Sequence, residues 1–140
     1  MLLRFIPAIH RITHRIGLSI GSAPELDVSQ GEAHILAHLA DHGVCTIADL
    51  HRALAHRRST LTSILDRLAE RRWIVRRTSE ADRRSFTIDL TPAGRTQARK
   101  VLRHLGSIEE ALEQGLTPDE IRQFAALLAK VDALTQPSQL

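Results

Sequence analysis

Cysteine and the aromatic residues are scarce in this chain of 140 residues. Three phenylalanines, one tryptophan and no tyrosine argue against a large β-sandwich and favour helices packed through leucine, isoleucine and alanine. The single cysteine cannot form an internal disulfide, so the fold needs no oxidising compartment. No uncharged apolar run is long enough to span a membrane. We therefore expect a cytoplasmic, mainly α-helical chain that forms one compact domain and has no membrane partner.

The motifs of common enzymes are also missing. The sequence has no glycine-rich phosphate loop, no nucleophile elbow and no His-Glu-x-x-His motif. His34 and His38 have the spacing of the histidines in that last motif, but Ile35 occupies the position of its glutamate base. We expect neither catalysis nor a cofactor.

Positive charge is concentrated in the middle third of the chain. Residues 46–90 contain ten arginines and six acidic residues, whereas residues 1–45 have a net charge of −1 and residues 91–140 a net charge of 0. A basic segment between neutral flanks indicates an anionic partner that is bound by the middle of the chain.

The N-terminal segment predicts an amphipathic helix rather than a targeting peptide. Ile9, Ile12, Ile16 and Ile20 recur at the spacing of one helix face. Pro7 fits the first turn of this helix, because proline has no amide hydrogen to donate there.

A helix-turn-helix is predicted next. Ser29 and Glu32 have capping-box spacing and begin a second helix, which Gly43 ends. Thr46 can cap a short third helix. After the connection "AHRR", a fourth helix is expected to begin near Ser59.

A two-stranded wing and two long helices complete the predicted order. A strand opens at Trp73 and returns over residues 85–90, with the charged residues "DRR" at the tip. Thr91-Pro92 and the capping box that begins at Thr117 start the last two helices.

The fourth helix and the wing carry the residue types that read DNA. Hydroxyls at the start of a helix can approach bases and phosphates closely, and guanidinium groups bind phosphate and guanine. An arginine-bearing hairpin tip can enter the minor groove, and an aspartate there can fix the shape of the tip. The predicted DNA-binding residues are Arg57, Arg58, Ser59, Thr60, Thr62, Ser63, Arg67, Asp82, Arg83 and Arg84.

In these segments the sequence resembles the MarR family of bacterial winged helix-turn-helix transcription regulators. The resemblance is carried by "TIADLHRAL", "STLTSILDRLAERRWIVRR" and "DRRSFTIDLTPAG"; the Asp-x-Arg of the wing and the Leu-Thr-x-x-Gly after it are the most specific parts. It implies a homodimer of repressor type that binds a near-palindromic operator in double-stranded DNA and is released by an effector. It also implies dimerisation helices at residues 1–28 and 92–140 around a DNA-binding region at 29–91. Many relatives have glycine where Arg72 stands, so we expect the fourth helix to end differently here.

Two alternatives remain open. Histidines recur at steps of four residues in two places, at His10 and His14 and at His34, His38 and His42. This spacing suggests a metal- or pH-responsive regulator. A winged helix used only for protein contact is the other alternative. Cys45, flanked by apolar residues, is expected to be a small buried side chain rather than a redox sensor.

Overall fold

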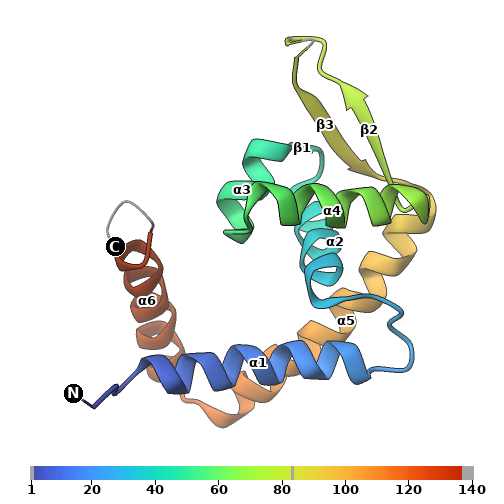
Figure 1. Cartoon of the computed structure of the whole chain (residues 1–140). Helices are drawn as coiled ribbons and strands as arrows, with labels where there is room; N and C mark the ends of the chain where they lie inside the picture. The colour runs from blue at the N-terminus through green and yellow to red at the C-terminus, as the bar shows by residue number, and fades with distance from the viewer. Residues whose placement is uncertain (1, 83, 137–140) are drawn as a thin grey trace. The chain divides into compact units, whose positions relative to one another are not determined.

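The computed structural model describes residues 2–82 and 84–136, and over these residues the chain is mainly helical with a small antiparallel sheet. Figure 1 shows the elements in chain order. They are α1 (Ile6–Ser22), α2 (Gln30–His42), β1 (Cys45–Thr46), α3 (Ile47–Leu54), α4 (Arg58–Glu70), β2 (Ile74–Thr78), β3 (Phe86–Leu90), α5 (Pro92–Gly115) and α6 (Pro118–Leu134). This order confirms the predicted fold class. The chain divides into two compact units, residues 1–104 and 105–140, and α5 contributes to both.

The predicted capping boxes are present. Ser29 accepts a hydrogen bond from the amide of Glu32, whose carboxylate accepts from the amide of Ser29, and this reciprocal pair begins α2. Thr117 begins α6 in the same way. Thr46 caps α3 as predicted, and Asp49 completes a third capping box there. The fourth helix begins at Arg58, one residue earlier than expected.

The sheet contains the predicted hairpin and one further strand. β2 and β3 pair antiparallel, with Ile74 opposite Leu90 at the base and Thr78 opposite Phe86 near the tip. β1 pairs with the other edge of β3, giving the strand order β1-β3-β2. With only two residues, β1 is too short to show an alternating pattern in the sequence, so it was not predicted.

The first unit has a well-defined apolar core. Side chains from α1 to α5 and the sheet meet there, and each is less than 2% exposed: Ile20, Ile35, Leu36, Leu50, Leu61, Leu65, Leu68, Ile88 and Val101. In the second unit no described residue of α6 is buried, although the helix carries an apolar stripe. No described helix is long and apolar enough to cross a membrane.

The end of α4 corrects one expectation. Arg72 has a φ of 59°, so it adopts the left-handed conformation that glycine has in many relatives. The amide of Trp73 donates to the carbonyl of Leu68 at 3.0 Å, and the amide of Arg72 donates to the carbonyl of Ala69 at 2.9 Å. These two bonds form a Schellman motif, which ends the helix in the usual way despite the missing glycine.

The start of α5 is fixed closely against the base of the hairpin. A Cβ atom on Gly94 would lie 1.8 Å from the carbonyl oxygen of Trp73, so only glycine fits there without a backbone shift. Thr91 donates from its hydroxyl to the carbonyl of Arg72 at 2.7 Å and accepts from the amide of Gly94 at 3.0 Å. This contact gives a physical reason for the Leu-Thr-x-x-Gly motif that begins at Leu90.

Candidate DNA-binding surface

The tight connection between α3 and α4 exposes the hydroxyl-rich first turns of α4. Ala55 adopts a left-handed conformation after α3, and Arg57 then occupies the N-cap position of α4 without a side-chain capping bond. Ser59 and Thr60 are exposed on the first turn and do not cap the helix. Their hydroxyls therefore stand on the surface, as the DNA-binding prediction requires.

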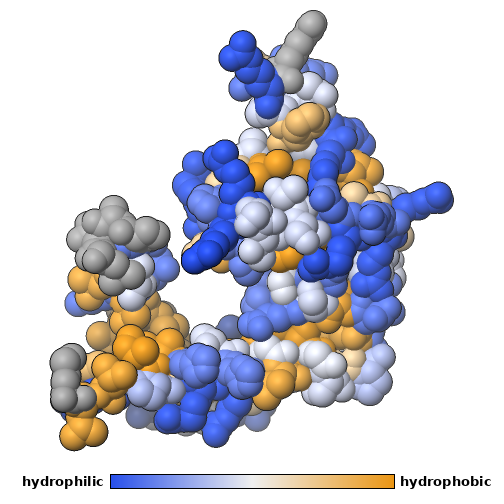
Figure 2. Space-filling model, in the orientation of Figure 1, coloured by the Kyte–Doolittle hydropathy of each residue, from blue (hydrophilic) through white to orange (hydrophobic). Residues whose placement is uncertain are grey.

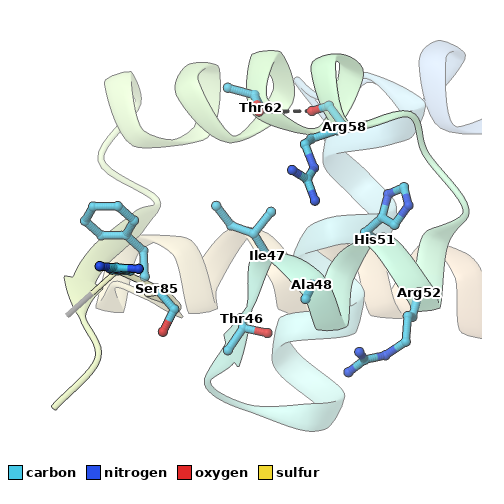
Figure 3. Close-up of a pocket in the computed structure, with 10 residues that line it drawn as sticks. Thr46, Ile47, Ala48, His51, Arg52, Arg58, Thr62 and Ser85 are labelled. Carbon is cyan, nitrogen blue, oxygen red and sulfur yellow. Dashed lines mark hydrogen bonds between the residues drawn. The ribbon is translucent and has the colours of Figure 1, made fainter. Parts of the chain in front are cut away.

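A groove separates α3 and the start of α4 from the wing. Its volume is about 590 Å³, and Figure 3 shows side chains from all three segments around it. Ile47, Ala48 and Phe86 give it apolar surface. The polar residues that line it are Thr46, His51, Arg52, Arg58, Thr62, Arg84 and Ser85. A groove edged by three guanidinium groups attracts a polyanion.

The wing tip is shaped by Asp82. One carboxylate oxygen of Asp82 accepts from the amide of Arg84 at 3.0 Å, and its backbone carbonyl accepts from the amide of Ser85 at 3.0 Å. These bonds fold the tip into an Asx-type turn and leave the side chain of Arg84 exposed. Asp82 thus has the internal role expected from the sequence. Arg83, which was predicted to contact DNA, lies outside the described residues.

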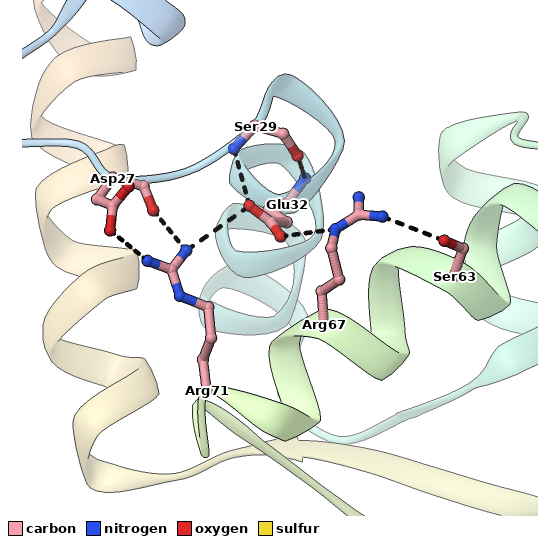
Figure 4. A network of polar contacts seen from close by, with 6 residues as sticks. All are labelled: Asp27, Ser29, Glu32, Ser63, Arg67 and Arg71. Atoms are coloured by element: carbon pink, nitrogen blue, oxygen red, sulfur yellow. Dashed lines mark hydrogen bonds and ion pairs between the residues drawn. The ribbon is translucent and has the colours of Figure 1, made fainter.

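Arg67 is held at the surface by contacts with other side chains of the protein. Its Nε donates to Glu32 Oε1 at 3.1 Å, and its Nη1 donates to Ser63 Oγ at 3.1 Å. Arg71 contacts Asp27 at 2.5 Å and Glu32 at 3.9 Å, and its guanidinium lies 3.9 Å from the centre of the Trp73 ring. Figure 4 shows these polar contacts as one network from the segment before α2 to α4. Arg71 therefore belongs to this network and is not merely a solvated charge on the helix surface.

Seven of the predicted residues line two hollows on the described surface. Arg58, Thr62 and Arg84 line the groove beside the wing. A second hollow along α4 is lined by Ser59, Thr60, Ser63 and Arg67, together with residues from the start of α2, the connection before α4 and α4 itself. Arg57 is exposed but lines neither hollow. Figure 2 shows hydrophilic side chains over much of the face that α3, α4 and the wing present.

Sequence reasoning missed the contribution of α3 to this surface. His51 and Arg52 both line the groove, and Arg52 is held by Asp49, which belongs to the capping box of the same helix. The spacing of Asp49 and Arg52, three residues apart, could have indicated that this arginine is oriented.

The histidines and the cysteine do not assemble a metal site among the described residues. The rings of His10 and His14 stack with centroids 5.9 Å apart, and those of His38 and His42 stack at 4.1 Å. Within residues 2–82 and 84–136, no three histidine, cysteine or acidic side chains converge as metal ligands would. Cys45 is buried as expected, and burial raises the pKa of its thiol to about 11.

Comparison with known proteins decides the family. The MarR family model matches residues 26–85, which include α2 to β2 and the wing tip. The chain belongs to the MarR family of winged helix-turn-helix transcription regulators. The family confirms the prediction of a DNA-binding regulator that is not an enzyme.

Individual proteins match most of the chain. The HTH-type transcriptional regulator YwhA of Bacillus subtilis is 27% identical over 127 residues, which are 86% of this chain and 91% of YwhA. The structure of Staphylococcus aureus MepR bound to DNA matches with a TM-score of 0.84 at 23% identity and covers 96% of this chain and 100% of MepR. Bordetella bronchiseptica BpsR, whose structure concerns regulation of DNA binding by 6-hydroxynicotinic acid, matches with a TM-score of 0.77 at 25% identity, covering 91% of this chain and 92% of that one.

Proposed function

We propose that this MarR-family regulator is a homodimeric repressor that binds a near-palindromic operator in double-stranded DNA and is released by a small-molecule effector. The observation that carries the proposal is the cationic groove between α3, α4 and the wing. Hydroxyls and guanidinium groups line this groove together, which supports the proposal that a recognition helix and a wing meet DNA there. The DNA contacts are proposed for the ten residues predicted from the sequence, with Asp82 acting through the shape of the tip.

Two exposed apolar surfaces support the dimer. The start of α1 and the residues before it expose large apolar side chains, among them Leu3, Phe5 and Ile12. On α6 the exposed apolar side chains are Phe124, Leu127, Leu128, Val131 and Leu134. Contiguous apolar surfaces of this kind mark protein–protein contacts in soluble proteins. We assign residues 1–28 and 92–140 to dimerisation and residues 29–91 to DNA binding, all within a cytoplasmic protein.

Two-fold symmetry would then determine the form of the operator. Two recognition helices related by a dimer axis enter successive major grooves roughly 34 Å apart, so the operator has two inverted half-sites. Each wing would reach the flanking minor groove, where an arginine is favoured over A·T-rich sequence. An effector that favours a different separation of the two helices would weaken both half-sites together.

The effector part of the proposal is supported by a relative. BpsR is a protein whose DNA binding is regulated by 6-hydroxynicotinic acid. For the present chain we propose only the class, a small molecule that binds the dimer and lowers its affinity for the operator.

Fluorescence anisotropy tests the proposal directly. The protein is titrated onto duplex from upstream of its own gene and onto scrambled duplex, over a series of salt concentrations. We expect tight, sequence-preferring binding whose log K falls by about 0.9 per phosphate contact for each tenfold rise in salt. Weak binding with little salt dependence would contradict the proposal and favour a protein-contact module.

A further inference from the structure

Glu32 is the one charged side chain that is buried among the described residues, with 5% of its surface exposed. A buried carboxylate is costly unless its charge is paired and its oxygens accept hydrogen bonds. Its Oε2 accepts from the amide of Ser29 at 2.8 Å, which is ordinary helix capping. Capping does not require the second contact, in which Oε1 accepts from Nε of Arg67 on α4.

The contact with Arg67 extends to the surface of α4. A guanidinium group has only donors, so in the 3.1 Å contact between Arg67 Nη1 and Ser63 Oγ the serine must accept. A serine hydroxyl has a single hydrogen, and this contact leaves that hydrogen free to point toward another acceptor. Ser63 is exposed and lines the surface of α4 together with Ser59 and Thr62. In Figure 4 the chain of contacts runs from Glu32 through Arg67 to Ser63.

We infer that Glu32 is a positioning residue that determines base preference through Arg67 and Ser63. Glu32 holds the arginine by Nε, the arginine orients the serine, and Ser63 then presents a hydrogen-bond donor to the DNA. A donor in the major groove selects an acceptor such as the N7 or O6 of guanine, the N7 of adenine or the O4 of thymine. The inference rests on the proposed function, because it requires α4 to face the base edges.

A purely structural ion pair makes a different prediction. If Glu32 and Arg67 only join α2 to α4, removing either side chain lowers the affinity for every duplex by the same factor. If they orient Ser63, the loss is concentrated at the base pair that Ser63 contacts. Base preference at one position therefore separates the two roles, whereas stability or total affinity does not.

The experiment begins with selection of preferred sequences from a randomised duplex library by the full-length protein. The enriched duplex and its single-base-pair variants are then titrated by anisotropy against Ser63→Ala, Arg67→Met and Glu32→Gln. One lost hydrogen bond corresponds to roughly a three- to tenfold loss of discrimination between the preferred base pair and the others. We expect this loss at the same base-pair position in all three variants. In the Ser63→Ala background, Glu32→Gln should cause no further loss at that position.

Arg71→Met is the matched control. Arg71 contacts the same carboxylate at 3.9 Å, but it has no described contact with Ser63. We expect this variant to lower the melting temperature and the overall affinity and to keep the wild-type base preference. If Glu32→Gln does not fold by circular dichroism, Arg67→Met carries the test, because its side chain is 48% exposed.

The possible failures are distinguishable. If the wild type enriches a sequence and either Arg67→Met or folded Glu32→Gln keeps the full preference, the inference is overturned and the DNA-binding function stands. Loss of preference at a position that Ser63→Ala leaves intact also overturns it. If the wild type enriches no sequence, the proposed function fails, and the inference fails with it.

Discussion

At the scale of single residues, Arg72 has a left-handed backbone conformation, which is strained for any residue that carries a Cβ atom. This conformation costs a non-glycine residue about 1–2 kcal/mol. Glycine avoids that cost, but it also gives the unfolded chain more conformational freedom, which offsets part of the gain in stability. We expect Arg72→Gly to stabilise the protein by about 0.5–1 kcal/mol. Thermal unfolding at a fixed protein concentration measures this change, which should raise the midpoint by a few degrees.

Arg72→Ala is the control for that substitution. It removes the same charged side chain but keeps a Cβ atom, so it should give no comparable gain. An equal rise in the melting temperature with alanine would show that the side chain of Arg72, and not its backbone conformation, is the source of the cost.

His34 makes stability depend on pH. Burial lowers the pKa of His34 below its ordinary value of 6.5, and the nearby His56 lowers the pKa further. Below pH 6.5 the unfolded chain therefore binds more protons at this residue than the folded chain does. The contribution of His34 to the free energy of unfolding is fully present above pH 6.5 and is lost as the pH falls through the lowered pKa of the folded state. Denaturant unfolding between pH 7.5 and 5 can measure this loss.

His34→Gln should reduce this dependence on pH. The exposed His51 on α3 offers a matched control. His51→Gln should leave most of the change of unfolding free energy with pH, the slope of the pH dependence, in place. The prediction concerns only the window below pH 6.5, because carboxyl groups dominate at lower pH. A slope that His34→Gln does not change would assign the dependence to other groups, such as His38, whose pKa burial also lowers.

At the scale of elements, the wing gives the most direct test of DNA contact. Arg84 is exposed at a tip that Asp82 holds in shape. We expect Arg84→Ala to weaken operator binding by roughly tenfold or more at moderate salt while the dimer stays intact, because a charge-assisted contact in the minor groove is lost. Anisotropy or a gel shift measures the affinity, and sedimentation measures the dimer.

Arg99→Ala on α5 is the control, since it removes the same charge from an exposed position that lines neither hollow on the candidate DNA-binding face. It should change the affinity far less than Arg84→Ala does. Equal losses in the two variants would mean that net charge, rather than the wing contact, determines the affinity.

The starts of the helices were the most predictable elements, and long-range contacts were the least. A capping box is local, so Ser29, Thr46 and Thr117 could be identified from residues three positions away. The contact of Glu32 with Arg67 joins residues 35 positions apart and leaves no periodic signal. The conformation of Arg72 was mispredicted because sequence preference disfavours it, while the bonds of the Schellman motif hold it in place.

The candidate site was predictable to a similar extent. The residue types and their spacing placed hydroxyls and arginines on α4 and the wing, and the structure brings Arg58, Thr62 and Arg84 to one groove. The sequence could not indicate that Arg67 and Arg71 would contact a buried carboxylate. Such partners depend on how α2 packs on α4, which local patterns do not describe.

At the scale of the whole molecule, the exposed stripe on α6 predicts that the dimer depends on it. Leu127 and Leu128 are 58% and 51% exposed in the single chain. Burying each leucine at an interface contributes about 1.5–3 kcal/mol, so a Leu127→Lys, Leu128→Lys variant should dissociate and lose tight operator binding. Sedimentation equilibrium and anisotropy on the same sample measure the two effects.

Ala129→Lys is the matched control, because at 100° per residue Ala129 lies on the side of α6 opposite the apolar stripe. It should leave the dimer and the operator affinity close to wild type. A double-lysine variant that remains dimeric would contradict the assignment of α6 to the interface.

The joint at Gly94 has a mechanical consequence. The carbonyl of Trp73 lies against the backbone of the first turn of α5, and Thr91 bonds to both the end of α4 and that turn. The end of α4, the base of the wing and the first turn of α5 therefore cannot swivel independently and behave as one lever. A force applied to the start of α5 would turn α4 and the wing together. Any hinge that changes their orientation therefore has to lie elsewhere along the chain.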